Sequence, residues 1–207
     1  MSSAMRLILL RHAETEWNMT GRLTSRTDLD LSPEGITQAE RVCKSLTELG
    51  PVPVIRSPAA RAAQTIVSYI TEMGIDDSID DRFHEVDFGI YEGCVGHECR
   101  QEADFRRWEA GENSTKYVAE PLHEAVHRIK SAIGDIIKRK PSDAIVVTHG
   151  VLLRLFVVSE VFQLPPGMFR RLRIDNARGA IVVFDEGKWR LTGFNVPAVG
   201  LAEWGSE

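Results

Sequence analysis

Short apolar runs alternate along the chain with longer segments whose apolar residues recur every three or four positions. The short runs are typical of buried strands, and the longer segments are typical of helices with one apolar face. Such alternation predicts an α/β fold, a three-layer αβα sandwich whose mostly parallel central sheet has helices on both faces. We expect strands at residues 5–10, 52–55 and 144–147, and helices at residues 33–49, 58–73, 122–138 and 150–162.

Local signals refine these boundaries. Ser32-Pro33 and Ser57-Pro58 each predict a helix start, with serine as the N-cap and proline at the first helical position. Near the C-terminus, Ala180–Phe184 and Trp189–Phe194 predict a hairpin around Asp185-Glu186-Gly187.

The segment between the second and third predicted strands has weaker patterning. Residues 76–96 are rich in acids and glycines and predict a loop, residues 97–110 predict a short polar helix, and residues 111–121 predict a connection. We expect one domain over residues 1–207, with a lid-like insertion around residues 94–120.

Composition excludes several functional classes. The net charge of −5 argues against a nucleic-acid partner, because such proteins usually carry a basic face. No stretch reaches the roughly 20 apolar residues of a membrane span, so no membrane partner is expected. Cys43, Cys94 and Cys99 do not form a disulfide framework, which favours reduced thiols and a cytoplasmic protein.

Arginine and histidine residues follow the predicted strands. The first strand ends in Arg11-His12, the second is followed by Arg61, and the last parallel strand ends in Thr148-His149-Gly150. Strand ends converge at one edge of a parallel sheet, and a loop near Glu85 can reach the same edge. Arginine and helix N-termini bind phosphoryl oxygens well, so the sequence predicts a phosphoryl site.

Each of these residues also has an ordinary interpretation. A single histidine at a strand end is more often structural than catalytic, Arg61 alone would be a surface charge, and Glu85 alone would be solvated. Their occurrence together at predicted strand ends favours the phosphoryl site.

The same residues carry a family resemblance. The stretch RHAETEWN from Arg11 resembles the RHG-type motif of the histidine phosphatase superfamily, which includes the cofactor-dependent phosphoglycerate mutases. The resemblance continues in order over about residues 5–155. It includes Gly21-Arg22-Leu23, Thr27-Asp28, Leu31-Ser32-Pro33-Glu34-Gly35, the stretch SPAARAAQT from Ser57, Glu85 with Phe88-Gly89-Ile90-Tyr91-Glu92-Gly93, and Val146-Val147-Thr148-His149-Gly150.

The resemblance implies a role for each matching position. His12 would be the nucleophile that forms a phosphohistidine, and Glu85 would protonate the leaving oxygen, helped by desolvation beside apolar neighbours. The phosphoryl oxygens would be held by Arg11, Arg61 and His149. Substrate contacts are expected from Asn18, Arg22, Ser25, Arg26, His84, His149 and Gly150.

Three positions depart from the family pattern. The family usually has glycine where Ala13 stands, so the backbone there need not adopt a positive φ. It often has glycine where Ser25 stands and proline where Asp30 stands. The two latter changes lie at the expected rim, where they bear on the substrate and not on the reaction.

A second motif indicates different chemistry. His123-Glu124-Ala125-Val126-His127 has the HExxH pattern of zinc hydrolases. Val126 belongs to a predicted apolar stripe, and no third ligand follows at a suitable spacing. No metal and no cofactor are therefore expected.

Within the resemblance, the 63 residues between Glu85 and His149 favour a phosphatase, because mutases of this type carry a longer insertion there. We therefore expect a metal-independent phosphomonoester hydrolase with a small phosphorylated metabolite as its partner. The alternatives are a phosphoglycerate mutase-type transferase and a non-catalytic phospho-ligand binder. Phe105, Arg106, Arg107 and Trp108 either contact the substrate or pack as ordinary residues; a homodimer is one alternative for the oligomeric state.

Overall fold

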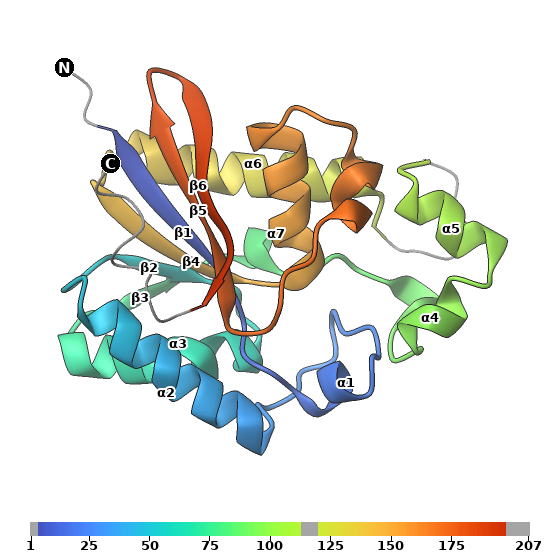
Figure 1. Ribbon diagram of the computed structural model, residues 1–207, viewed down its shortest axis with the longest axis horizontal. Coiled ribbons are helices and arrows are strands. Elements are labelled where there is room, and N and C mark those ends of the chain that lie inside the picture. The colour runs from blue at the N-terminus through green and yellow to red at the C-terminus, as the bar shows by residue number, and fades with distance from the viewer. Residues whose placement is uncertain (1–3, 113–119, 198–207) are drawn as a thin grey trace.

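The computed structural model describes residues 4–112 and 120–197, whose strands form one six-stranded sheet (Figure 1). The strands lie in the order β3-β2-β4-β1-β5-β6, and β1 to β4 are parallel to one another. β5 is antiparallel to both β1 and β6. Their bounds are β1 Met5–Arg11, β2 Val54–Arg56, β3 Asp77–Ile79, β4 Asp143–Thr148, β5 Arg178–Asp185 and β6 Lys188–Pro197.

Helices cover both faces of this sheet, which confirms the predicted three-layer α/β fold (Figure 1). On one face α2 (Pro33–Thr47) and α3 (Ala60–Met73) bury residues such as Val42 and Ile66. On the other face α6 (Leu122–Lys138) and α7 (Gly150–Phe156) bury residues such as Ile129 and Leu152. No helix among the described residues is long and apolar enough to cross a bilayer.

Parallel register brings the polar strand ends together. Arg11 lies opposite Thr148, and Arg56 lies opposite Val147. The residues that follow these pairs therefore leave the sheet at the same edge. Figure 1 shows α1 (Glu16–Met19), α4 (Gly96–Cys99) and α5 (Ala103–Glu109) grouped together at the right of the view, where α1 follows β1 directly.

The C-terminal hairpin and the start of α2 confirm their predictions. The β5–β6 turn is made by Glu186 and Gly187, both with positive φ, as a two-residue hairpin turn requires. Ser32 is the N-cap of α2, and its hydroxyl accepts the Gly35 N–H.

The predicted start of α3 was wrong. This helix begins at Ala60 with Ala59 as its N-cap, and the Ser57 hydroxyl accepts the Ala59 N–H and bonds the His149 ring. The long helix predicted after Gly150 also ends early, at Phe156, and continues as a π-helical turn, η3 (Val157–Val161).

The weakly patterned segment was predicted least well. Residues 76–96 contain β3 and the 3₁₀ turns η1 (Asp81–Phe83) and η2 (Gly89–Tyr91), and a third such turn, η4, spans Pro166–Arg171. The single polar helix expected at 97–110 is two helices, α4 and α5. Phe105 and Trp108 of α5 are fully buried, so this segment is anchored in the core and is not polar.

Candidate active site

His12 follows β1 directly and is almost fully buried, with 4% of its surface exposed. Its backbone N–H donates to the Thr148 carbonyl at 2.9 Å, which fixes the end of β1 against β4. Nδ1 lies 2.7 Å from the Ala13 carbonyl oxygen, which can only accept. The proton therefore resides on Nδ1, and Nε2 keeps its lone pair. The Ala13 backbone has no positive φ, as the sequence suggested.

Arg61 and His149 form a buried pair beside His12. The Arg61 guanidinium donates to the carbonyls of Thr27 and Ser25 at 3.0 and 2.9 Å. Its Nη2 also lies 3.3 Å from His149 Nδ1, which must then be the acceptor. His149 Nε2 accordingly donates to the Ser57 hydroxyl at 2.8 Å.

Arg11 and Arg61 each keep a buried N–H donor that is not used within the described part of the protein. Arg11 donates from Nη1 to the Ile174 carbonyl at 2.7 Å. Nε of Arg11 and Nε of Arg61 are both buried without a hydrogen-bond partner among the described residues. Unpaired buried donors on fixed guanidinium groups are suited to an anion.

The electrostatics keep both histidines neutral. Burial, followed by the charges of Arg61 and Arg11, holds the pKa of His12 well below 6.5. Burial and the Arg61 charge likewise hold the pKa of His149 well below that value. Burial, with the nearby Arg154 charge, lowers the pKa of Arg11 to about 10, so this guanidinium stays cationic at neutral pH.

Glu85 is buried at the N-terminus of α7. Its Oε1 accepts the N–H groups of Val86 and Leu152, and its Oε2 accepts that of Val151 at 2.9 Å. All three partners are N–H donors, so both carboxyl oxygens of Glu85 act as acceptors. The predicted apolar burial is present, with Val86 and Phe88 nearby in the core, but it comes with three hydrogen bonds that the sequence did not indicate. Oε2 retains a lone pair for a further partner.

A cavity of about 130 Å³, here called the inner pocket, is lined by Arg11, His12 and Glu85 but not by Arg61 or His149. It shares Arg11, Asn18, Arg22 and Arg154 with a larger cavity of about 900 Å³, here called the outer cavity. The inner pocket is lined by Arg11, His12, Asn18, Arg22, Leu23, Thr24, Glu85, Phe88, Gly150, Val151 and Arg154.

Asn18, Arg22 and Gly150, which were predicted to contact the substrate, therefore line the inner pocket. The Asn18 Oδ1 accepts from Thr15 and from Asn176, which leaves its amide N–H groups for a ligand. Arg22 donates to the Gly93 carbonyl at the rim. A Cβ on Gly150 would lie 3.1 Å from Arg11 Nε, so the missing side chain lets α7 begin against that guanidinium.

Three other residues that were predicted to contact the substrate, Ser25, Arg26 and His84, do not line the inner pocket. The Ser25 hydroxyl is buried and bonds Glu92, which also accepts the Ser25 and Thr27 N–H groups. Arg26 is half exposed and lies 3.6 Å from Asp87. His84 is partly buried and stacks on His149 with ring centroids 6.5 Å apart, outside the residues that line the inner pocket. Burial, with the Arg26 charge, lowers the pKa of His84.

The four residues named from the predicted lid divide into core and surface residues. Trp108 packs against Phe88, Phe105 and Phe169, and its indole N–H donates to the Glu120 carbonyl. Arg106 donates to nearby backbone carbonyls, and Arg107 lies 3.8 Å from Glu112. None of the four lines the inner pocket or the outer cavity.

The HExxH residues lie on the exposed side of α6, where His123 and His127 face away from the core. The described part of the chain brings no third histidine, cysteine or carboxylate to them.

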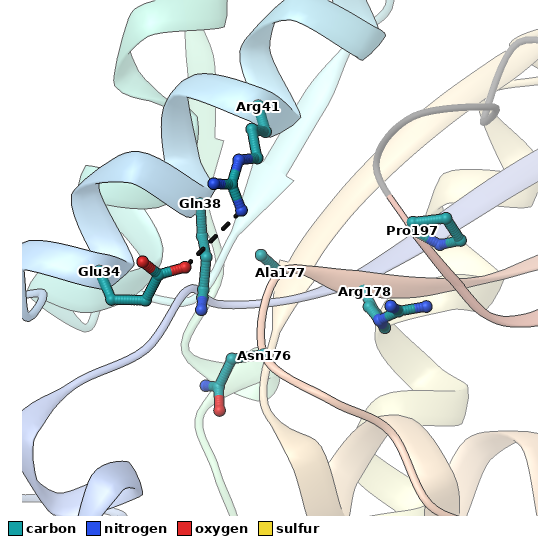
Figure 2. A pocket seen from close by; sticks show the side chains of 7 residues that line it. All are labelled: Glu34, Gln38, Arg41, Asn176, Ala177, Arg178 and Pro197. Carbon is teal, nitrogen blue, oxygen red and sulfur yellow. Dashed lines mark ion pairs between the residues drawn. The ribbon is translucent and has the colours of Figure 1, made fainter.

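Arg154 and Asn176 are polar site residues that had not been predicted. Arg154 lines both cavities, one helical turn after Gly150, and a search along α7 for a cation on the Gly150 face would have found it. Asn176 donates to the His12 carbonyl and to Asn18 Oδ1 from an irregular segment that carries no sequence signal. It also lines a cavity of about 190 Å³ beside α2, where Figure 2 shows it with Arg41, paired to Glu34, and with Arg178.

Comparison with known proteins agrees with this geometry. The model of the histidine phosphatase superfamily, branch 1, matches residues 7–197, and the chain belongs to this family. A curated relative, "Probable phosphoglycerate mutase GpmB" of Enterobacter sp. (strain 638), is 30% identical over 95% of this chain and 93% of its own length.

Solved structures show the same fold. The Mycobacterium tuberculosis protein of open reading frame Rv3214 has a TM-score of 0.79 and 30% identity, covering 94% of this chain and 98% of its own. The α-ribazole phosphatase of Shigella flexneri has a TM-score of 0.82 and 21% identity, covering 95% of this chain and 99% of its own. The matched proteins carry the names of a phosphatase and of a probable mutase.

The low pKa values of His12 and His149 predict a pH-dependent stability. An unfolded histidine takes up a proton below about pH 6.5, whereas these two stay neutral when folded. Stability is therefore lost as the pH falls, by about 3 kcal/mol for the two histidines together between about pH 7.5 and 5.5. Urea unfolding at several pH values measures this loss.

The double variant His12→Asn/His149→Asn is the control for that measurement. Its free energy of unfolding should fall by about 3 kcal/mol less than that of the wild type over the same pH range, because the two titrating groups are gone. Equal slopes in the two proteins would mean that the buried histidines do not titrate as described.

Proposed function

We propose that the protein is a metal-independent phosphomonoester hydrolase that acts through a phosphohistidine on His12. The observation that carries this proposal is the hydrogen bond from His12 Nδ1 to the Ala13 carbonyl, which presents the Nε2 lone pair in a pocket lined by Arg11. A neutral, oriented imidazole is the nucleophile that such a reaction needs.

In the first step, Nε2 attacks the phosphorus and the bond to the ester oxygen breaks. Arg11 and Arg61 supply positive charge that offsets the phosphoryl oxygens, Asn18 adds N–H donors, and the N-terminus of α7 adds partial positive charge. The neutral His149, whose ring nitrogens bond Arg61 and Ser57, holds the Arg61 guanidinium in place beside His12. Phosphoryl transfer depends mainly on such positioning and charge neutralisation, which supports catalysis without a metal.

The leaving oxygen also needs a proton. Glu85 is the carboxyl group that lines the inner pocket, so it is the group positioned to supply this proton. The neutral acid then donates this proton to the departing alkoxide. In the second step, the resulting carboxylate accepts a proton from water as that water attacks phosphorus, which releases phosphate and regenerates the neutral His12.

Hydrolysis is favoured over a mutase reaction because the inner pocket adjoins a large, polar outer cavity through which water can reach the phosphohistidine. Mutase-type transfer is the second candidate, since the curated relative carries that name.

A panel of phosphomonoesters assayed in EDTA tests the proposal. We expect each turnover to release one inorganic phosphate in the chelator, without isomerised product when 2- or 3-phosphoglycerate is supplied. Exchange of the phosphoryl group between the two phosphoglycerates, faster than phosphate release, would instead establish the mutase. Loss of activity in EDTA that is restored by metal would contradict the proposed chemistry.

A further inference from the structure

The outer cavity carries more positive charge than one phosphoryl group requires. The described residues that line it include the carboxylates Glu14 and Asp175 and six arginines, which are Arg11, Arg22, Arg100, Arg154, Arg173 and Arg178. A cavity of this sign concentrates anions at its mouth and favours ligands with several negative charges.

The three arginines that line the outer cavity but not the inner pocket are already paired with acids. Arg100 donates to the buried Glu109 at 2.9 Å. Arg173 and Arg178 share Asp175, at 2.9 and 3.8 Å. Arg154 has no ion pair with a carboxylate in the described part of the chain, and it lines the inner pocket as well as the outer cavity.

Arg154 is also held in place before any ligand arrives. Its Nε donates to the Gly150 carbonyl at 2.8 Å, and its Nη1 donates to the Leu172 carbonyl at 3.2 Å. Its guanidinium carbon lies 5.1 Å from the centre of the Phe169 ring. A cation oriented by carbonyl groups keeps its full charge and loses little conformational freedom when it binds.

Burial makes this charge costly in the free protein. It lowers the pKa of Arg154, an effect that the charge of Glu85 opposes. An anion beside the guanidinium would offset that cost.

We infer that Arg154 binds a second anionic group of the substrate, a carboxylate or a phosphate, in the outer cavity, while the ester phosphoryl group lies against His12. This inference rests on the proposed function and specifies its substrate class. The substrates are small phosphomonoesters that carry another negative charge a few bonds from the ester oxygen.

Matched ligand pairs test the inference by binding, in the His12→Ala background so that hydrolysis does not consume them. 3-Phosphoglycerate and glycerol 3-phosphate share a skeleton and differ in one carboxylate. Fructose 1,6-bisphosphate and fructose 6-phosphate differ in one phosphate. Calorimetry should show the doubly anionic member of at least one pair binding about tenfold tighter or more.

Adding Arg154→Met should reduce that preference to within about threefold, because methionine keeps the apolar contact with Phe169 but not the charge. Arg154→Lys should retain part of it, whereas Arg190→Met, an exposed change at the far end of the sheet, should retain all of it. The ratio within each pair cancels any loss common to both ligands. If Arg154→Met does not fold, raising the salt concentration should weaken the preference in the parent protein.

No preference in either pair, or a preference that survives Arg154→Met and high salt, would overturn the inference. Because binding is measured without turnover, either result leaves the proposed hydrolase untouched. The hydrolase fails separately, if wild type and His12→Ala release phosphate at equal rates.

Discussion

Replacing His12 with alanine is expected to lower kcat for every phosphomonoester by about 10⁴-fold or more, the usual scale for loss of a nucleophile. In the proposed mechanism no other described group can take its place. His149 is close, with ring centroids 5.2 Å apart, but its Nδ1 accepts from Arg61 and its Nε2 donates to Ser57. Steady-state assays with p-nitrophenyl phosphate measure the loss.

His127→Ala is the matched control, because it removes an exposed histidine from α6 without touching the cavity. It should keep nearly all activity. His12→Asn, which retains a polar side chain in the buried site, separates loss of the nucleophile from loss of the fold when circular dichroism accompanies the assay. Activity of either His12 variant within tenfold of wild type would exclude His12 as the nucleophile.

Replacing Glu85 with glutamine is expected to have the second largest effect, and one that depends on the leaving group. Alkyl phosphates release a poor leaving group that needs a proton, so their kcat should fall by about 10²- to 10³-fold. p-Nitrophenyl phosphate releases a stable phenolate, so its rate of bond cleavage should fall much less. Rates of single-turnover phosphoryl transfer for the two substrate classes provide the comparison.

The glutamine also changes the contacts of the N-terminus of α7, since its amide cannot accept from Val86, Val151 and Leu152 as the carboxylate does. A structural loss of this kind would affect both substrate classes equally. Glu92→Gln is the control, because Glu92 is bonded to Ser25 and Thr27 and does not line the inner pocket. Equal losses for both classes in Glu85→Gln would remove the general-acid role.

The sequence predicted the centre of the site because its residues follow regular elements. Arg11 and His12 end an apolar run, and His149 ends another, so a parallel sheet had to bring them together. Arg61 was predictable for the same reason, as a cation in the first turn of a helix that follows a strand. Local pattern and sheet geometry agree at these positions.

The rim was harder to predict because irregular backbone builds it. Asn176 and the Ile174 carbonyl come from a segment without periodicity, yet they hold His12, Asn18 and Arg11. The tautomer of His12 depends on a carbonyl one residue away. The orientation of the Ser25 hydroxyl depends on Glu92, 67 residues later. Such partners are fixed by tertiary packing and not by spacing along the chain.

The central claim is a covalent phosphohistidine, and trapping it is the most direct test. Enzyme mixed with a phosphorus-32-labelled phosphomonoester is quenched rapidly in alkali, which preserves phosphohistidine, and the labelled peptide is mapped by mass spectrometry. Phosphorus NMR of the same peptide distinguishes the two ring nitrogens. The account predicts an acid-labile phosphoryl group on Nε2 of His12, formed and lost at rates consistent with turnover. Label on Nδ1 or on another residue, or phosphate release in a single turnover without any labelled protein, would contradict it.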